Sequence, residues 1–173
     1  SLSNGSRIDD VNTDFSQGNI ESTESATDFA LDGKGFFTVQ RNNGVNSNTY
    51  YTRDGHFHVN MSGNLVTDSG DSVMGTDASG NQTPINVGNG QVQCDTSGNI
   101  SVDGVVKYKL KLADFNDYKS LTKVGDILYQ GDAAIESKAS VKQNALENSN
   151  VNVINEMVNM MTTMRSFETN QKI

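Results

Sequence analysis

The chain has 173 residues, a hydrophobic fraction of 34% and a formal net charge of −8 at pH 7. This length suits one domain, and the apolar content is enough for a modest core. The acidic balance argues against nucleic acid as a partner, because phosphate groups would find few cations to neutralise them. No apolar run approaches the roughly 20 residues of a transmembrane helix, so we expect no membrane insertion. The single cysteine, Cys94, cannot form a disulfide within the chain.

The N-terminal residues 1–27 are polar, with isolated apolar positions and a turn signal at Gln17-Gly18-Asn19. This pattern predicts an extended connecting segment that crosses a surface. The chain begins at Ser1 without Met and stops inside a helical pattern at Ile173. We therefore expect the natural protein to continue beyond both ends.

Residues 28–140 have the pattern of a turn-rich antiparallel β body. Short apolar runs are separated by Asp-Gly steps, which favour hairpins because glycine accepts a positive φ without penalty. These steps are Asp32-Gly33, Asp54-Gly55 and Asp103-Gly104. Later in this region apolar residues alternate with lysines, which predicts a strand with one buried and one solvated face. The apolar members are Val106, Tyr108, Leu110 and Leu112, and the polar members are Lys107, Lys109 and Lys111.

An internal repeat, Asp/Asn-x-Ser-Gly-Asn, begins at Asn60, Asp77 and Asp95. It predicts type I turns in which the glycine takes the left-handed position of a bulged hairpin. These glycines are Gly63, Gly80 and Gly98. The side chain at each turn entry is placed to bond the backbone further on. Calcium binding is the alternative interpretation, but the repeat lacks the alternating oxygens and the terminal Glu of an EF-hand loop.

The C-terminal residues 141–173 are predicted to form a connector and an amphipathic α-helix. From Leu146 onwards there is no Gly or Pro, and the apolar residues step by four, three, four and three, the seam of a coiled coil. The seam residues are Val153, Met157, Met160, Met164 and Phe167. Such a stripe needs a cover, which is either this chain's own body or another helix. The predicted fold class is therefore mainly β with a C-terminal α-helix: a turn-rich antiparallel β domain plus a coiled-coil-type helix.

No constellation in the sequence points to catalysis, so we expect no enzyme and no cofactor. His56 and His58 lie two apart on a predicted strand and have the spacing of metal ligands, but there is no further histidine and Cys94 is the only thiol. Two half-exposed strand histidines are the simpler interpretation. Without another base, a Ser or Cys nucleophile has no partner to activate it. Gly33-Lys34-Gly35 lacks the spacing and the following helix of a phosphate-binding loop.

Six phrases, in order along the chain, carry a resemblance that covers nearly its whole length. They lie at residues 17–23 with 28–37, 51–57 with 63–66, 112–115, 124–129, 145–152, and 156–160 with 165–170. Together they resemble the flagellar hook–basal-body rod protein family, and within it the distal rod subunits. The short middle region is similar to that of rod members rather than that of hook or hook-cap members, which carry added domains.

The resemblance implies a structural role without catalysis. Rod-family members are exported through the flagellar type III export apparatus without a cleaved signal, and their copies stack helically into a hollow drive shaft between motor and hook. Their terminal helices form a coiled coil inside the tube, with a β-rich domain outside. The implied partners are further copies of the chain and other flagellar rod and hook proteins. The implied location is the flagellar basal body, outside the cytoplasm.

The resemblance assigns packing and register roles, rather than chemical ones, to residues of its phrases. These residues are Gln17, Gly18, Asp28, Gly33, Gly35, Phe36, Phe37, Asp54, Gly55, Leu146, Ser149, Asn150 and Val151. Within the family, a proximal-rod paralogue or a hook-type subunit is the alternative. A different class, a surface adhesin-like β binding module, would need a concave aromatic patch, for which the candidates are Tyr50, Tyr51 and Tyr108.

Overall fold

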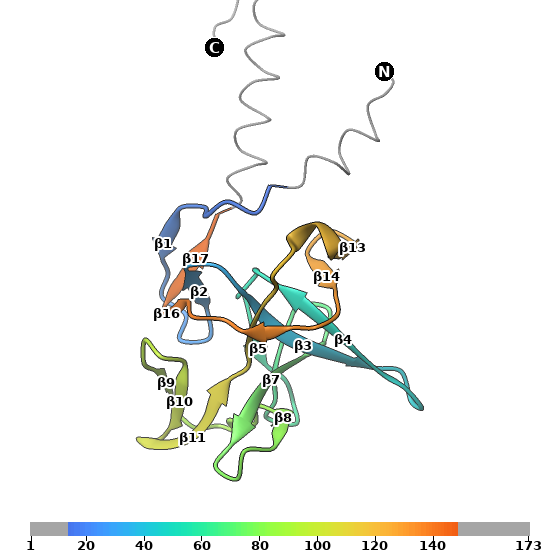
Figure 1. Cartoon of the computed structure of the whole chain (residues 1–173). Helices are drawn as coiled ribbons and strands as arrows, with labels where there is room; N and C mark the ends of the chain where they lie inside the picture. The colour runs from blue at the N-terminus through green and yellow to red at the C-terminus, as the bar shows by residue number, and fades with distance from the viewer. Residues whose placement is uncertain (1–13, 149–173) are drawn as a thin grey trace, which may run out of the picture. The chain divides into compact units, whose positions relative to one another are not determined.

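The structure is a computed structural model that describes residues 14–148 and divides the chain into two compact units. Residues Ile20–Glu147 form one unit, which we call the β body (Figure 1). The described residues of the other unit are 14–19 and 148. Among the residues described, no helix is long and apolar enough to cross a membrane.

The β body consists of short strands joined by tight turns, with one 3-10 turn, η1 (Tyr118–Ser120). The strands are β1 (Ile20–Ser22), β2 (Phe29–Asp32), β3 (Phe36–Asn42), β4 (Ser47–Thr52), β5 (His58–Val59), β6 (Leu65–Val66), β7 (Ser72–Asp77), β8 (Gln82–Pro84), β9 (Val92–Cys94), β10 (Asn99–Val102), β11 (Val105–Leu110), β12 (Leu112–Asp114), β13 (Thr122–Val124), β14 (Leu128–Gln130), β15 (Ile135–Glu136), β16 (Ser140–Gln143) and β17 (Ala145–Glu147). The strands are short because Gly, Asn and Asp recur throughout the sequence, and each of these residues favours a turn over a strand.

Within residues 14–148, three antiparallel sheets make up the β body. The large sheet has the strand order β13-β14-β4-β3-β7-β11-β10-β9. Five of its strands lie off this path: β6 and β8 pair with β7, β12 pairs with β3, β5 pairs with β6, and β15 pairs with β12. Two small sheets pair β1 with β17 and β2 with β16. Each small sheet joins a strand near the start of the body to a strand near its end.

The predicted fold class is wrong in its C-terminal α-helix. Over residues 14–148 the chain is antiparallel β, without an α-helix. The first part of the predicted connector and helix forms β16 and β17 instead, because Val141 and Ala145 are buried there and the backbone completes the sheets of β2 and β1. Residues 149–173 lie outside the described residues. The five seam residues fall in that range: Val153, Met157, Met160, Met164 and Phe167.

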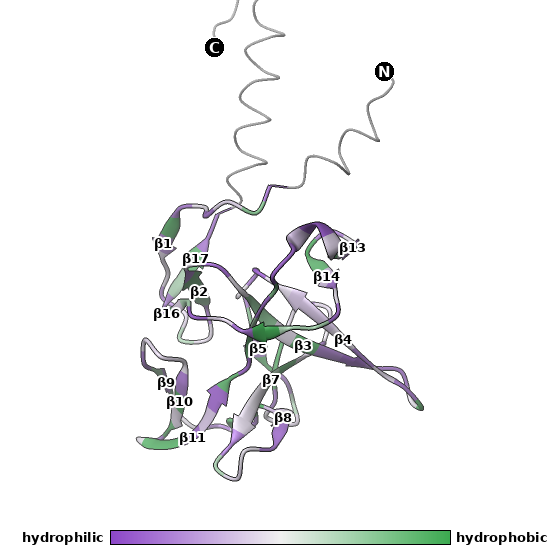
Figure 2. Cartoon of the chain, viewed as in Figure 1, coloured by the Kyte–Doolittle hydropathy of each residue, from purple (hydrophilic) through white to green (hydrophobic). Residues whose placement is uncertain are grey.

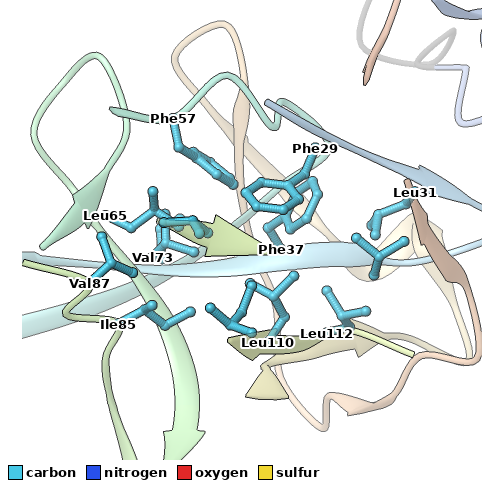
Figure 3. Close-up of a cluster of buried hydrophobic side chains, with 14 of the residues drawn as sticks. Phe29, Leu31, Phe37, Phe57, Leu65, Val73, Ile85, Val87, Leu110 and Leu112 are labelled. Atoms are coloured by element: carbon cyan, nitrogen blue, oxygen red, sulfur yellow. The ribbon is translucent and has the colours of Figure 1, made fainter. Parts of the chain in front are cut away.

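The main hydrophobic core is built by the large sheet together with the β2–β16 pair. Phe29 and Leu31 of β2 and Phe37 of β3 are at most 1% exposed, and Phe57 joins them from the segment before β5. The three phenylalanine rings lie against one another in Figure 3, and the ring centroids of Phe37 and Phe57 are 5.2 Å apart in an edge-to-face arrangement. Such aromatic pairs contribute about 0.5–1.5 kcal/mol beyond the burial of their area.

The predicted strand with alternating lysines is present, but it is divided into two strands, and one of the side chains that we expected to be buried is exposed. β11 ends at Leu110, and the chain resumes as β12 at Leu112. All three lysines are exposed and both leucines are buried, as the alternation predicts. Val106 is 62% exposed, against the prediction, because the register with β10 shifts between Ile100 and Ser101. A bulge of this kind re-aims the side chains beside it.

The repeated turns are confirmed. The glycine φ angles are +87° at Gly63, +85° at Gly80 and +90° at Gly98. At the second turn the Asp77 Oδ1 atom accepts hydrogen bonds from the backbone amides of Ser79 at 3.0 Å and Asn81 at 2.9 Å. Asn60 and Asp95 make the same pair of bonds at the other turns. The oxygens that the calcium interpretation would use therefore stabilise the turns.

Candidate assembly site

The two ends of the β body lie side by side, because β1 pairs with β17 and places Ile20 opposite Glu147. The chain passes from β16 to β17 through Asn144, whose φ of 58° is one that asparagine adopts more readily than most residues. The backbone amide of Thr23 donates to the Asn144 carbonyl oxygen at 2.7 Å. We call the β1–β17 and β2–β16 pairs, with the side chains that hold them, the terminal strand cluster.

Asp28 is a buried carboxylate at the start of β2, with a residue exposure of 4%. Its Oδ2 atom accepts the hydroxyl of Thr23 at 2.8 Å, and its Oδ1 atom lies 2.9 Å from Nδ1 of His56. Its backbone carbonyl oxygen accepts the amide of Asn144 at 2.9 Å. The hydrogen bond to Asp28 raises the pKa of His56, because it favours the protonated imidazole. Asp28 therefore joins the segments that contain Thr23, His56 and Asn144, which are distant from one another in the sequence.

Gly55 allows the segment before β5 to pass directly against β2. The Phe29 amide donates to the Gly55 carbonyl oxygen at 3.0 Å, and the Phe57 amide donates to the Thr27 carbonyl oxygen at 3.3 Å. A Cβ atom at position 55 would overlap the Phe29 carbonyl oxygen. The absence of a side chain is therefore required by the close approach of two backbones.

Arg53 makes the most extensive polar contacts of the terminal strand cluster. Its guanidinium forms a bidentate ion pair with Glu147 of β17, with N–O distances of 2.9 Å and 2.7 Å. It also donates to three carbonyl oxygens in and after β2: Leu31 at 3.2 Å, Gly33 at 2.7 Å and Gly35 at 3.0 Å. The Arg53 side chain is 23% exposed and that of Glu147 is 10% exposed. Arg53 therefore attaches the last strand of the body to the β2–β3 loop.

The β2–β3 loop itself packs tightly against the segment before β16. Gly35 is buried, and a Cβ atom there would overlap the hydroxyl of Ser137. That hydroxyl donates to the Lys34 carbonyl oxygen at 2.6 Å and accepts the amide of Ala139 at 3.1 Å. A Cβ atom at Gly33 would lie 3.1 Å from the Cα atom of Ala139. Glycine at both positions therefore fits the close contact between these segments.

Gln143 of β16 covers the edge strand β9 with its side-chain amide. Its Oε1 atom accepts the backbone amide of Cys94 at 2.9 Å, and its Nε2 atom donates to the carbonyl oxygens of Val92 at 3.0 Å and Ala26 at 2.7 Å. The amide thus occupies backbone groups that an open strand edge would offer to another strand. Burial raises the pKa of the neighbouring Cys94 thiol to about 12, so this cysteine is neutral near pH 7.

Phe36 anchors a second aromatic cluster on the other side of β3. Its ring centroid lies 5.9 Å from that of Phe115, 5.5 Å from Tyr118 and 5.7 Å from Tyr129. Tyr51 packs edge-to-face against Phe115 at 4.9 Å. Tyr50 is 8% exposed and Tyr108 packs partly buried against the main core. The three tyrosines considered for an adhesin are thus packing residues.

The structure brings most of the packing residues predicted from the family phrases into the β body. They are Asp28, Gly33, Gly35, Phe36, Phe37, Asp54, Gly55 and Leu146. Gln17, which is exposed, and Gly18, which is buried, belong to the other unit. Ser149, Asn150 and Val151 lie outside the described residues.

The sequence did not single out Arg53, Gln143 or Glu147. Arg53 immediately precedes the predicted Asp54-Gly55 turn, but its ion-pair partner lies 94 residues later, and no local pattern links the two. Gln143 falls in a stretch that we expected to be a polar connector. The two histidines do not converge: His56 contacts Asp28, whereas Nδ1 of His58 lies 3.8 Å from Asp68. In the described part of the chain, no group of three or more His, Cys, Asp or Glu is arranged to hold a metal.

Two family models match the chain. The flagellar hook protein FlgE/F/G D1 domain matches residues 30–108, which cover most of the large sheet. The flagellar basal body rod FlgEFG protein C-terminal model matches residues 142–173, a range that begins within β16. The Arg53–Glu147 contact therefore joins the two matched ranges, because Arg53 lies in the first and Glu147 in the second.

Individual relatives agree with these models. A flagellar basal-body rod protein FlgG of Buchnera aphidicola subsp. Baizongia pistaciae is 34% identical over 197 residues, covering 99% of this chain and 69% of the relative. A flagellar basal-body rod protein FlgF of Caulobacter vibrioides is 32% identical over 167 residues, covering 94% of this chain and 66% of the relative. The flagellar hook protein FlgE of Helicobacter pylori is 40% identical over 79 residues, 46% of this chain and 11% of that protein. The chain therefore belongs to the FlgE/F/G family of flagellar rod and hook proteins.

Proposed function

We propose that the chain is a structural subunit of the distal flagellar rod, where its copies assemble helically into the hollow drive shaft between motor and hook. Its family supports a structural role in the flagellar basal body, and rod relatives match it along nearly its whole length. A proximal-rod paralogue or a hook-type subunit remains the alternative within the same family.

The observation that carries the proposal is the attachment of both ends of the β body to one another and to the core. The chain enters through β1 and leaves through β17, and these strands pair side by side. The Arg53–Glu147 ion pair then fixes β17 to the β2–β3 loop. A force applied to either end of the body is therefore shared by a strand pair, an ion pair and three carbonyl contacts. A subunit that transmits torque needs such a rigid attachment.

The proposed assembly uses heterologous contacts, in which one patch of a subunit meets a different patch of the next. Contacts of this kind build open helical filaments, because the rotation between neighbours does not close a ring. Family membership implies assembly with other flagellar rod and hook proteins. We propose in addition that the chain binds its own copies and is delivered by the flagellar type III export apparatus.

Deletion and complementation in the source bacterium test this proposal. The full-length gene with an epitope tag should restore swimming, and the tag should label the rod of purified basal bodies. The position of the label along the rod distinguishes a distal subunit from a proximal or hook-type one. Normal swimming and complete rods in the deletion strain would contradict the proposal. An adhesin would instead leave rods intact and lose binding to glycan surfaces.

A further inference from the structure

The turn of the β3–β4 hairpin contains an Asn-Gly step, Asn43-Gly44, at the end of a long projecting hairpin (Figure 1). Residues 42–48 are all exposed, and Val45 in the turn is 95% exposed. Figure 2 shows a hydrophobic (green) tip at the end of this hairpin, next to a hydrophilic (purple) part of its strands. Loop tips of this kind open locally at low free energy, because few buried contacts hold them.

We propose that Asn43 is a site of spontaneous deamidation. The backbone nitrogen of Gly44 attacks the side-chain Cγ atom of Asn43, a C–N bond forms and ammonia leaves, which gives a five-membered succinimide. Water then opens the ring at one of its two carbonyls. The product is aspartate when the side-chain carbonyl is attacked, and isoaspartate when the backbone carbonyl is attacked. No oxidant, reductant or enzyme is needed.

The local geometry favours this reaction. Among the described residues, none accepts a hydrogen bond from the Gly44 amide, so the attacking nitrogen is not engaged. Apart from Gly44 itself and its two neighbours in the chain, no residue has an atom within 4 Å of the position that a Gly44 Cβ atom would occupy, so the backbone has room to rotate towards Asn43. The Asn43 Oδ1 atom accepts the amide of Asn46 at 3.2 Å, which withdraws electron density from Cγ.

Within residues 14–148 there is one further Asn-Gly step, Asn89-Gly90, which provides a natural control in the same chain. Its nucleophile is engaged, because the Gly90 amide donates to the Val87 carbonyl oxygen at 3.0 Å. Its backbone is also confined, since a Cβ atom at Gly90 would overlap Val102 and lie 2.9 Å from Asp103 Oδ2. The same dipeptide is therefore reactive in one turn and protected in the other.

Deamidation would alter the hairpin tip in two ways. Each product adds a negative charge to a chain that is already acidic. Isoaspartate also inserts a methylene group into the backbone, which is incompatible with the turn bond from the Asn43 amide to the Asn46 carbonyl oxygen at 3.0 Å. The exposed Val45 would consequently move relative to the strands.

Peptide mapping by mass spectrometry tests the proposal on the whole chain. Native protein is incubated in mildly alkaline buffer and sampled over days, then cleaved with trypsin. Cleavage after arginine and lysine places Asn43 in the fragment 42–53 and Asn89 in the fragment 54–107. Fragmentation locates the conversion of amide to acid and separates aspartate from isoaspartate. A sample in denaturant and an Asn43→Gln variant are run in parallel.

In the native protein we expect Asn43 to convert at least about tenfold faster than Asn89, which corresponds to a protecting free energy of about 1.4 kcal/mol in the second turn. In denaturant the two rates should become similar. Fragment 42–53 of the Asn43→Gln variant should stay unconverted. Equal rates in the native protein would overturn the proposal, as would an Asn43 that converts in denaturant but not in the folded chain.

Discussion

Replacing Arg53 by Met tests the contact that attaches the last strand to the body. Methionine keeps the apolar stem but removes the guanidinium. The ion pair with Glu147 is bidentate, and its side chains are 23% and 10% exposed. Exposed pairs contribute about 0–1 kcal/mol, whereas breaking a buried pair costs about 3–5 kcal/mol. Because this pair is mostly buried and three carbonyls also lose their donor, we expect the free energy of unfolding to fall by about 2–3 kcal/mol.

The assay is thermal and urea unfolding followed by circular dichroism. For a body of this size, 1 kcal/mol corresponds to a Tm shift of about 3–5 °C, so Arg53→Met should lower Tm by about 10 °C. Glu147→Gln and the double variant complete a cycle, in which the coupling should exceed about 1 kcal/mol. Lys123→Met, at an exposed position of β13, is the control. A change in the free energy of unfolding of no more than about 0.5 kcal/mol, the range of ordinary surface substitutions, would show that the Arg53–Glu147 contact does not hold the last strand to the body.

Three further substitutions test the remaining contacts of the terminal strand cluster. The raised pKa of His56 means that its bond with Asp28 stabilises the fold fully below about pH 6.5, the unfolded value, and that this contribution is lost as pH rises through the folded pKa. The stability difference between wild type and His56→Asn should therefore shrink with rising pH; a constant difference would contradict this. Gly55→Ala should cost at least about 1–3 kcal/mol, because the new methyl overlaps the Phe29 carbonyl oxygen, and an unchanged Tm would disprove the close approach. Gln143→Leu should cost about 1–3 kcal/mol and speed hydrogen exchange at the Cys94 amide, and unaltered exchange would exclude the covering role of Gln143.

The local turn chemistry could be predicted from the sequence because it depends on residues close together in the chain. The Asp/Asn-x-Ser-Gly-Asn turns have the left-handed glycines and the side-chain bonds that their residue types require. The family phrases likewise indicated the structural class. Each turn motif or phrase consists of residues close together in the sequence, so it can be recognised without knowledge of the rest of the fold.

Long-range pairing could not be predicted from local patterns. Residues 140–147 look like a polar connector in sequence, yet they become β16 and β17, since strands from the other end of the body are available to pair with them. The same limit applies to Arg53 and Glu147, which are unremarkable until the fold brings them together. The exposure of Val106 depends on a bulge in the pairing of β10 with β11, which the lysine alternation does not reveal.

Electron cryo-microscopy of basal bodies would show whether the chain is a rod subunit. Basal bodies would be purified from the deletion strain carrying the tagged full-length gene, and the rod would be reconstructed with helical averaging. We expect repeated density along the distal rod, and the β body, including its β1–β17 pair, should fit this density once per subunit. Rods that contain no density of this shape, or that are unchanged when the gene is deleted, would contradict it.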